Sequence, residues 1–190
     1  HLKTPSEDST IKIGLLPGVG NKRNNRAWPE SSYQELIRVL VTNLPESKIL
    51  LIGGQQEESL ANKLSTNQQV ENHCNKHTIL ETGQLLSSCN VVIGGDTGPL
   101  HLAAAVGTPI IPLFGPTSLN RTGPLGTQTI QPVLPSESLH CWPCELATCP
   151  LEGERNLACM KEISVEQVHK TCLSVIEQQT CSITDRQVLC

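Results

Sequence analysis

The sequence predicts an α/β fold in which a doubly wound parallel sheet carries helices on both faces. Its apolar segments are short and nearly continuous, as in residues 49–52, which is typical of strands covered on both faces. Between them lie segments whose apolar residues recur at helical spacing, and the two patterns alternate as far as residue 113. This alternation favours right-handed crossovers, and 190 residues suffice for one domain with a full core.

We expect the domain to span residues 10–179, with residues 1–9 as a leader or linker and residues 180–190 as a tail. The expected strands are short apolar segments at residues 10–16, 49–52, 79–80, 90–94 and 110–113. Residues 127–134 are a candidate sixth strand, which Pro132 would confine to a sheet edge because proline cannot donate to the ladder.

The helices are expected between and after these strands. Ser32 and Glu35 have the spacing of a capping box, and apolar residues repeat at helical spacing behind them. Residues 57–64 and 84–88 predict two shorter helices. Ser164, with a glutamine three residues later, predicts the start of a final helix.

Residues 91–109 are the most informative segment. They read as an apolar strand, a turn that bears Asp96 and Thr97, and a short Ala-rich helix. Asp96 can cap this helix, Pro99 suits its first turn and Gly107 suits its end. A strand–turn–helix of this kind directs free backbone N–H groups and the positive end of the helix dipole outward, which favours a phosphate.

Three loops that follow predicted strands carry polar groups, at residues 17–29, 53–58 and 95–100. In an open parallel sheet, ligands bind beyond the carboxyl ends of the strands, where such loops meet. The sequence therefore predicts a site for a phosphate-containing ligand at this edge.

Each loop also has a simpler interpretation. Asp96 fits a plain helix cap, His101 a packed core histidine, and Glu57 a solvated helix start that is favourable with the helix dipole. The basic residues of the first loop fit an ordinary solvated surface, and they are Lys22, Arg23 and Arg26.

The third loop and the helix behind it resemble one family. Residues 96–109 read Asp-Thr-Gly-x-x-His-Leu-Ala-Ala-Ala-x-Gly-x-Pro, and Phe-Gly-Pro-Thr follows at residues 114–117. This pattern is similar to the donor-site signature of the ADP-heptose:lipopolysaccharide heptosyltransferases, glycosyltransferase family nine. The resemblance covers residues 11–176 and implies the Rossmann-like C-terminal domain of a GT-B-type enzyme.

The resemblance also implies an activity. Enzymes of this family transfer L-glycero-D-manno-heptose from ADP-heptose to the lipopolysaccharide inner core with inversion. Their general base is a carboxylate of the N-terminal acceptor domain, so no catalytic residue is assigned in this chain. We therefore expect a donor-binding half that is inactive alone, needs no cofactor for transfer and meets the acceptor through that missing domain. The implied location is the cytoplasm, with peripheral association at the inner-membrane face left open.

The first two loops carry donor-binding roles in this resemblance. Arg26 precedes Ala-Trp-Pro as the family's basic residue precedes Trp-Pro, which implies a contact with the donor diphosphate. Asn21 and Lys22 fall where loop contacts to phosphate occur, and Lys22 or Arg23 is the alternative to Arg26. Glu57 is the expected partner of the adenosine ribose hydroxyls, with its neighbour Glu58 as the alternative.

The third loop carries the remaining roles. The resemblance implies that Asp96 contacts the sugar of the donor, and that Thr97 and Gly98 contact phosphate. The expected donor-binding set also includes the helix start behind them, which is Pro99, Leu100 and His101.

Nine cysteines are the outlier of the composition. Four of them fall in the segment 140–160, and they are Cys141, Cys144, Cys149 and Cys159. Four thiolates at such spacing can hold a tetrahedral Zn²⁺ or iron ion in a structural site. Two disulfides or free thiols are the alternatives. Similar Cys-rich segments occur in the heptosyltransferase II branch of the family.

The composition argues against several classes of function. The net charge of −4 and the aromatic content of 2% do not fit a nucleic-acid-binding surface. No apolar run approaches the roughly 20 residues that cross a bilayer. Two alternatives remain: a non-catalytic nucleotide- or metal-binding module on the same fold, and another GT-B enzyme such as a UDP-sugar epimerase.

Overall fold

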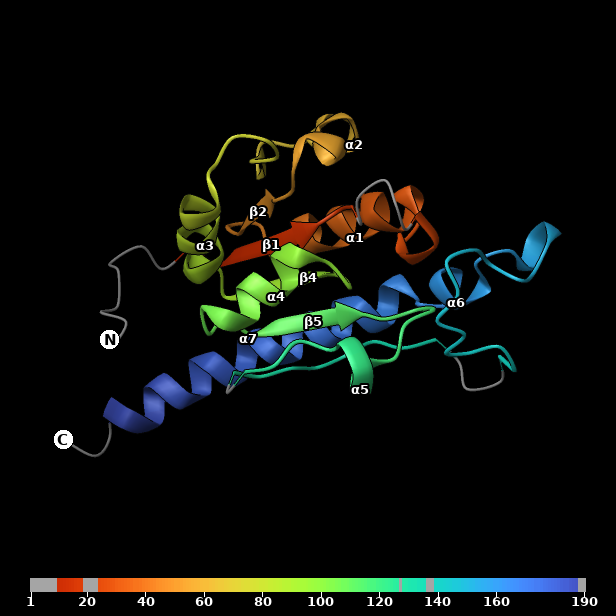
Figure 1. Cartoon of the computed structure of the whole chain (residues 1–190). Coiled ribbons are helices and arrows are strands. Elements are labelled where there is room, and N and C mark those ends of the chain that lie inside the picture. Colours follow the sequence, from red (N-terminus) through yellow and green to blue (C-terminus); the bar gives the residue numbers. More distant parts are fainter. Residues whose placement is uncertain (1–9, 19–23, 127, 136–138, 188–190) are drawn as a thin grey trace.

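The computed structural model describes residues 10–18, 24–126, 128–135 and 139–187 (Figure 1). Its sheet contains five parallel strands in the order β3-β2-β1-β4-β5. The strands are β1 (Lys12–Leu16), β2 (Lys48–Leu51), β3 (Val70–Asn72), β4 (Val91–Gly95) and β5 (Ile110–Leu113). The predicted α/β fold with a doubly wound parallel sheet is confirmed.

Helices connect the strands and cover both faces of the sheet. The α-helices are α1 (Glu30–Asn43), α2 (Glu58–Leu64), α3 (Ile79–Ser88), α4 (Gly98–Ala105), α5 (Leu119–Thr122), α6 (Ala158–Lys161) and α7 (Val165–Gln187). The described residues also form three short 3-10 helices, η1 (Asn24–Arg26), η2 (Gln55–Glu57) and η3 (Gly153–Arg155). No helix in the described part of the chain is both long and apolar enough to span a membrane.

The core forms two layers because successive side chains of a strand point to opposite faces. Ile13 and Leu15 of β1 lie in the larger layer, which also contains apolar residues of α1 and α7. Leu16 belongs to the opposite layer, with Leu100 of α4 and Leu86 of α3. Both layers are fully buried at β1 and β4, so the centre of the sheet is the rigid base of the loops that follow these strands.

The strand predicted at residues 79–80 is wrong. Ile79 and Leu80 begin α3, and their side chains are 75% and 79% exposed. Thr78 and Glu81 form a capping box there, in which each side chain bonds the other residue's backbone N–H. The third strand is instead Val70–Asn72, a segment with one buried residue and no apolar run.

Two other predicted boundaries differ from the structure. The capping box of Ser32 and Glu35 is absent, because α1 begins at Glu30 with Pro29 at its N-cap and no side-chain cap. Helix α7 continues to Gln187, past the predicted end of the domain at residue 179. The start of α7 agrees with its prediction, since the Ser164 hydroxyl accepts a hydrogen bond from the Gln167 N–H.

A sixth strand does not form in the described part of residues 127–134. Ile130 and Val133 make only isolated parallel bridges to Ile110 and Leu113 of β5. Pro132 lies between the two bridging residues and has no N–H to donate, which accounts for the interrupted pairing.

Candidate functional site

The three predicted loops meet at one cavity of about 470 Å³ beyond the carboxyl ends of β1, β2 and β4. The residues that line it are Leu16, Gly18, Arg26, Ile52, Gly53, Gly54, Glu57, Asp96, Thr97, Gly98 and Pro99. A volume of this size is typical of a small-molecule site. Leu16 and Ile52 give it an apolar floor, and its polar groups come from all three loops.

The loop after β1 is anchored by two aromatic side chains. The Trp28 indole donates a hydrogen bond of 2.9 Å to the Ile163 carbonyl. The Tyr33 hydroxyl donates one of 2.9 Å to the carbonyl of Leu16, the last residue of β1. The two rings pack edge to face with centroids 5.0 Å apart, and burial raises the pKa of Tyr33 above its ordinary value. Arg26, two residues before Trp28, is therefore held by a fixed segment.

The Asp96 carboxylate contacts three other side chains at the site. Its Oδ2 accepts a hydrogen bond of 2.6 Å from Arg26 Nη1 and one of 3.0 Å from the Thr122 hydroxyl. Its Oδ1 lies 3.4 Å from His101 Nε2. The simpler interpretation of Asp96 as a helix cap is wrong, because Thr97 occupies the N-cap of α4 and the carboxylate turns toward its three partners instead.

The start of α4 presents its backbone to the cavity. Pro99 lies in the first turn and Gly107 has a φ of +81° after the helix end, both as predicted. A side-chain atom added at Gly98 would meet nothing within 4 Å, so the backbone there is open to a ligand. The Thr97 hydroxyl is buried and has no hydrogen-bond partner within the described residues. An unpartnered buried hydroxyl is costly, so this oxygen indicates the position of a missing polar group.

Leu100 and His101 do not line the cavity. The Leu100 side chain is fully buried in the core layer beneath α4, so it supports the helix start by packing. The His101 side chain is 44% exposed and faces Asp96, so the interpretation of His101 as a packed core histidine is wrong.

Glu57 joins the first two loops. Its Oε2 accepts a hydrogen bond of 2.9 Å from the Gly54 N–H, and its side chain fills the space that a Cβ at Gly18 would need. Glu58, the alternative, does not line the cavity and accepts a hydrogen bond of 3.3 Å from Asn75. The structure thus distinguishes the two carboxylates and places Glu57 at the site.

Some expectations fall outside the described residues. Asn21, Lys22 and Arg23 belong to this group, so the structure places only Arg26 among the basic candidates of the first loop. One partner of the site was not predicted at all, the Thr122 hydroxyl from α5. A single threonine in a four-residue helix gives no local signal of such a role.

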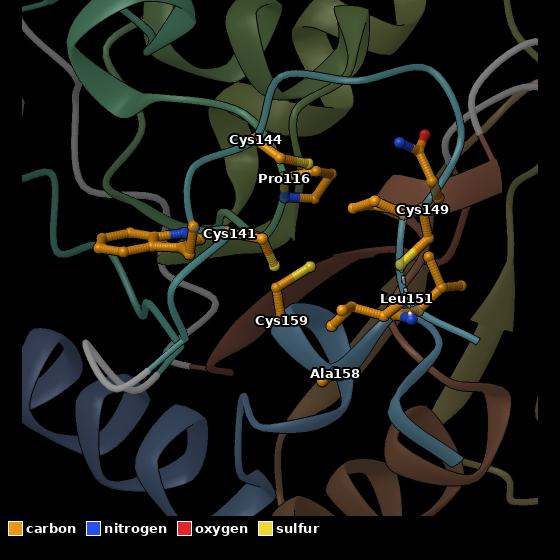
Figure 2. Close-up of a pocket in the computed structure, with 11 residues that line it drawn as sticks. Pro116, Cys141, Cys144, Cys149, Leu151, Ala158 and Cys159 are labelled. Atoms are coloured by element: carbon orange, nitrogen blue, oxygen red, sulfur yellow. Dashed lines mark hydrogen bonds between the residues drawn. The ribbon is translucent and has the colours of Figure 1, made fainter. Parts of the chain in front are cut away.

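The four clustered cysteines surround a second, smaller cavity (Figure 2). All of the cysteines whose side chains the structure describes are free thiols, so the alternative of two disulfides in this segment is not formed. No three His, Cys, Asp or Glu side chains in the described part of the chain already have the separations of a metal-binding cluster.

Comparison with known proteins agrees with the geometry. A family model described as "Glycosyltransferase family 9 (heptosyltransferase)" matches residues 4–153. Lipooligosaccharide heptosyltransferase 2 of Campylobacter jejuni serotype O:2 is 32% identical over 163 residues, which are 82% of this chain and 48% of the relative. The chain thus spans about half the length of this curated relative.

Solved structures of heptosyltransferases have a similar fold. The ADP-heptose lps heptosyltransferase II of E. coli superposes with a TM-score of 0.72 at 20% identity, covering 92% of this chain and 49% of that one. The E. coli heptosyltransferase WaaC with ADP superposes with a TM-score of 0.67 at 22% identity, covering 90% and 46%. At these identities the likeness shows a shared fold.

Proposed function

Because this chain belongs to glycosyltransferase family 9, the heptosyltransferase family, we propose that it is the donor-binding half of an inverting heptosyltransferase that uses ADP-heptose. The observation that carries this proposal is the cavity where Arg26, Asp96 and the open start of α4 meet. It combines a cation, an acceptor and free backbone donors, which a nucleotide-linked sugar requires.

The diphosphate of the donor is assigned to the start of α4 and to Arg26. The open backbone at Gly98 and the unpartnered Thr97 hydroxyl are donors at the positive end of a helix dipole. Arg26 lines the cavity with its guanidinium held by Asp96, and such a fork of five N–H donors suits the oxygens of a phosphate. These groups would stabilise the negative charge that develops on ADP as it leaves.

Asp96 is assigned to the sugar. Its carboxylate beside a diphosphate is tolerable because Arg26 and Thr122 both donate to the same oxygen. Its other oxygen lies 3.4 Å from His101 Nε2, and Asp96 lines the cavity in which we place the sugar. A carboxylate held in this way can accept hydrogen bonds from the hydroxyl groups of a heptose.

Glu57 is assigned to the adenosine ribose. Ribose hydroxyls are donors, and a carboxylate at the carboxyl end of β2 suits them in a nucleotide-binding sheet. Its Oε2 is held by the Gly54 N–H, and the side chain lines the cavity.

The remaining parts of the reaction lie outside this chain in our proposal. The lipopolysaccharide core acceptor and the general base belong to an N-terminal domain of comparable size, and the whole enzyme works at the cytoplasmic face of the inner membrane. The 190-residue chain alone then binds donor without turning it over, and transfer itself needs no cofactor.

Titration calorimetry of the purified chain with ADP, UDP and GDP tests the proposal. We expect ADP to bind tightest. Equal or tighter binding of UDP would contradict the assignment and favour the UDP-sugar epimerase alternative. Absence of binding by all three nucleotides would favour a non-catalytic module.

A further inference from the structure

The hydroxyl of Thr122 bonds differently from those of other helical threonines in this chain. Three of those donate at 2.8 Å to the carbonyl four residues earlier in the same helix, and they are Thr42, Thr82 and Thr171. The Thr122 hydroxyl lies 3.3 Å from the corresponding carbonyl, that of Ser118, but 3.0 Å from Asp96 Oδ2. A hydroxyl has one proton, and a charged acceptor forms the stronger bond, so this proton belongs to Asp96.

Helix α5 gives the Thr122 hydroxyl a defined position. The Leu119 side chain packs against the core layer beneath α4. Arg121 forms an ion pair of 2.9 Å with Glu145, which ties the helix to the segment beyond β5. Gly123 closes the helix with a hydrogen bond of 2.7 Å from its N–H to the Leu119 carbonyl, and a Cβ there would clash with that oxygen. The helix is therefore held independently of Asp96.

Two donors on one oxygen fix the orientation of the Asp96 carboxylate. The χ2 torsion of aspartate is broad and roughly two-fold, so a single bond does not define which way each oxygen points. Arg26 Nη1 from η1 and the Thr122 hydroxyl from α5 both donate to Oδ2. The convergence distinguishes the two oxygens and places Oδ1 on the side of His101, 3.4 Å from its Nε2.

We propose that Thr122 is a positioning residue that determines which oxygen of Asp96 meets the donor sugar, and thereby sets the preference for a nucleotide-linked sugar over the bare nucleotide. This inference rests on the proposed function, in which Asp96 contacts the sugar. Thr122 is not among the residues that line the donor cavity, so it acts through Asp96. Without its hydroxyl, the carboxylate rotates more freely and presents a less directed acceptor to the sugar hydroxyls.

Competition between ADP-heptose and ADP, measured on the full 190-residue chain, tests the role of Thr122. Thr122→Val keeps the shape of the side chain and removes the donor. We expect the preference for ADP-heptose to fall about fivefold, as for the loss of one ordinary hydrogen bond. Thr122→Ser keeps the hydroxyl and should restore most of the preference. An unchanged preference in Thr122→Val, or an equal loss in Thr122→Ser, would overturn the proposal.

Thr42→Val is the matched control, because the Thr42 hydroxyl bonds the Arg38 carbonyl within α1. It should leave the preference unchanged, and a similar loss there would also count against the proposal. Thermal unfolding of each variant is recorded alongside. A lower melting temperature of Thr122→Val with an unchanged preference would assign the hydroxyl to the fold alone.

A double-mutant cycle with Asp96→Ala shows whether Thr122 acts through the carboxylate. In the Asp96→Ala background, Thr122→Val should cause no further loss of preference, because the two residues act as one unit. A second loss of about fivefold would mean that Thr122 acts independently of Asp96, and would overturn the positioning role.

The wild-type chain separates this inference from the proposed function. A chain that binds neither ADP nor ADP-heptose would overturn the proposed function itself. A chain that binds both equally would overturn the assignment of Asp96 to the sugar, and the role of Thr122 with it. A chain that prefers ADP-heptose, and keeps that preference in Thr122→Val, would overturn the role of Thr122 alone.

Discussion

Arg26 and Asp96 form a charge-assisted hydrogen bond of 2.6 Å, and only 12% and 7% of their side chains are exposed. The two residues are 70 positions apart and come from the loops after β1 and β4, which are neighbours in the sheet. Removing one partner of a buried pair leaves the other charge uncompensated. Substitutions at this pair will therefore change stability as well as binding, and both must be measured.

Arg26→Ala should weaken ADP binding by about 1.5–3 kcal/mol, because a hydrogen bond from a charged donor to the diphosphate is lost. It should also lower the melting temperature, since Asp96 loses a partner. Arg38→Ala is the matched control, because Arg38 pairs with Glu35 on the surface of α1 and is 67% exposed. Calorimetry and thermal unfolding check both effects, and unchanged ADP affinity in a folded Arg26→Ala protein would remove Arg26 from the site.

Asp96→Asn should leave ADP affinity intact and reduce the preference for ADP-heptose over ADP by about 1 kcal/mol. The substitution keeps an acceptor for Thr122 and removes the charge that our proposal directs to the sugar. Competition between ADP and ADP-heptose measures the preference. A lower melting temperature with both affinities unchanged would mean that Asp96 has only a structural role.

Thr97→Val should weaken ADP binding by about 0.5–1.5 kcal/mol without destabilising the fold. The two side chains have the same shape, and the Thr97 hydroxyl is buried without a partner in the described structure, so the folded chain loses no hydrogen bond. Chemical denaturation and calorimetry together make the check. Loss of stability with unchanged binding would assign the hydroxyl to the fold instead of the ligand.

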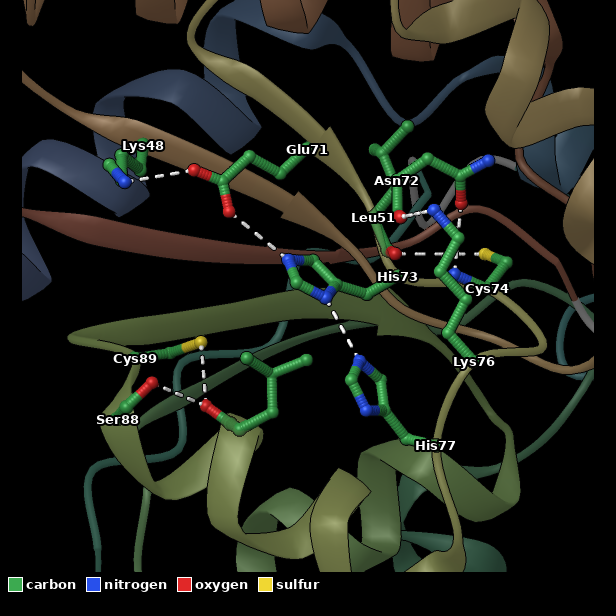
Figure 3. Close-up of polar contacts among 11 residues, drawn as sticks. Lys48, Leu51, Glu71, Asn72, His73, Cys74, Lys76, His77, Ser88 and Cys89 are labelled. Carbon is green, nitrogen blue, oxygen red and sulfur yellow. Dashed lines mark hydrogen bonds and ion pairs between the residues drawn. The ribbon is translucent and has the colours of Figure 1, made fainter.

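Glu71→Gln should lower stability at neutral pH and have no effect in acid. Figure 3 shows Glu71 between Lys48 and His73. Its carboxylate lies 2.9 Å from Lys48 Nζ and 3.1 Å from His73 Nε2, and the hydrogen bond from Lys48 holds the pKa of Glu71 below its ordinary value. A depressed pKa contributes stability above the unfolded value of about 4.3, and this is lost as the pH falls through the folded value.

The size of the Glu71 effect is limited by solvent. The side chain is 39% exposed, so we expect at most about 1 kcal/mol at pH 7. Denaturation at pH 7 and pH 3 provides the measurement. A difference between the two proteins that is as large at pH 3 as at pH 7 would show that the carboxylate charge is not its cause.

Much of the fold could be predicted because most strands are short, buried and apolar. β3 was missed because Val70 is its only buried residue, so pairing with β2 defines this strand more than hydrophobicity does. Ile79 and Leu80 were wrongly predicted to form a strand for the opposite reason, since they are apolar but exposed. The Thr78 capping box was the better signal at that position.

The loops of the site could be predicted from strand ends, but the partners of Asp96 could not. A helix cap is a local interaction, and Asp96 has the right position for one. The Asp96 carboxylate instead bonds Arg26 and Thr122, which are distant in sequence. The guanidinium and the hydroxyl both donate to the same oxygen, and the bond from Arg26 is charge-assisted. The choice between a helix cap and these distant partners depends on how the chain packs, and a local sequence pattern carries no information on that.

The core layer that β1 shares with α7 has a consequence for shortened forms of the chain. Ile13 and Leu15 of β1 share a core layer with Val168 and Cys172 of α7. During synthesis α7 emerges after the other described elements, so this layer lacks the part of its cover that α7 supplies until that helix has been made. A chain that ends before α7 would expose this apolar face and aggregate, even though every loop of the candidate site has already been synthesised.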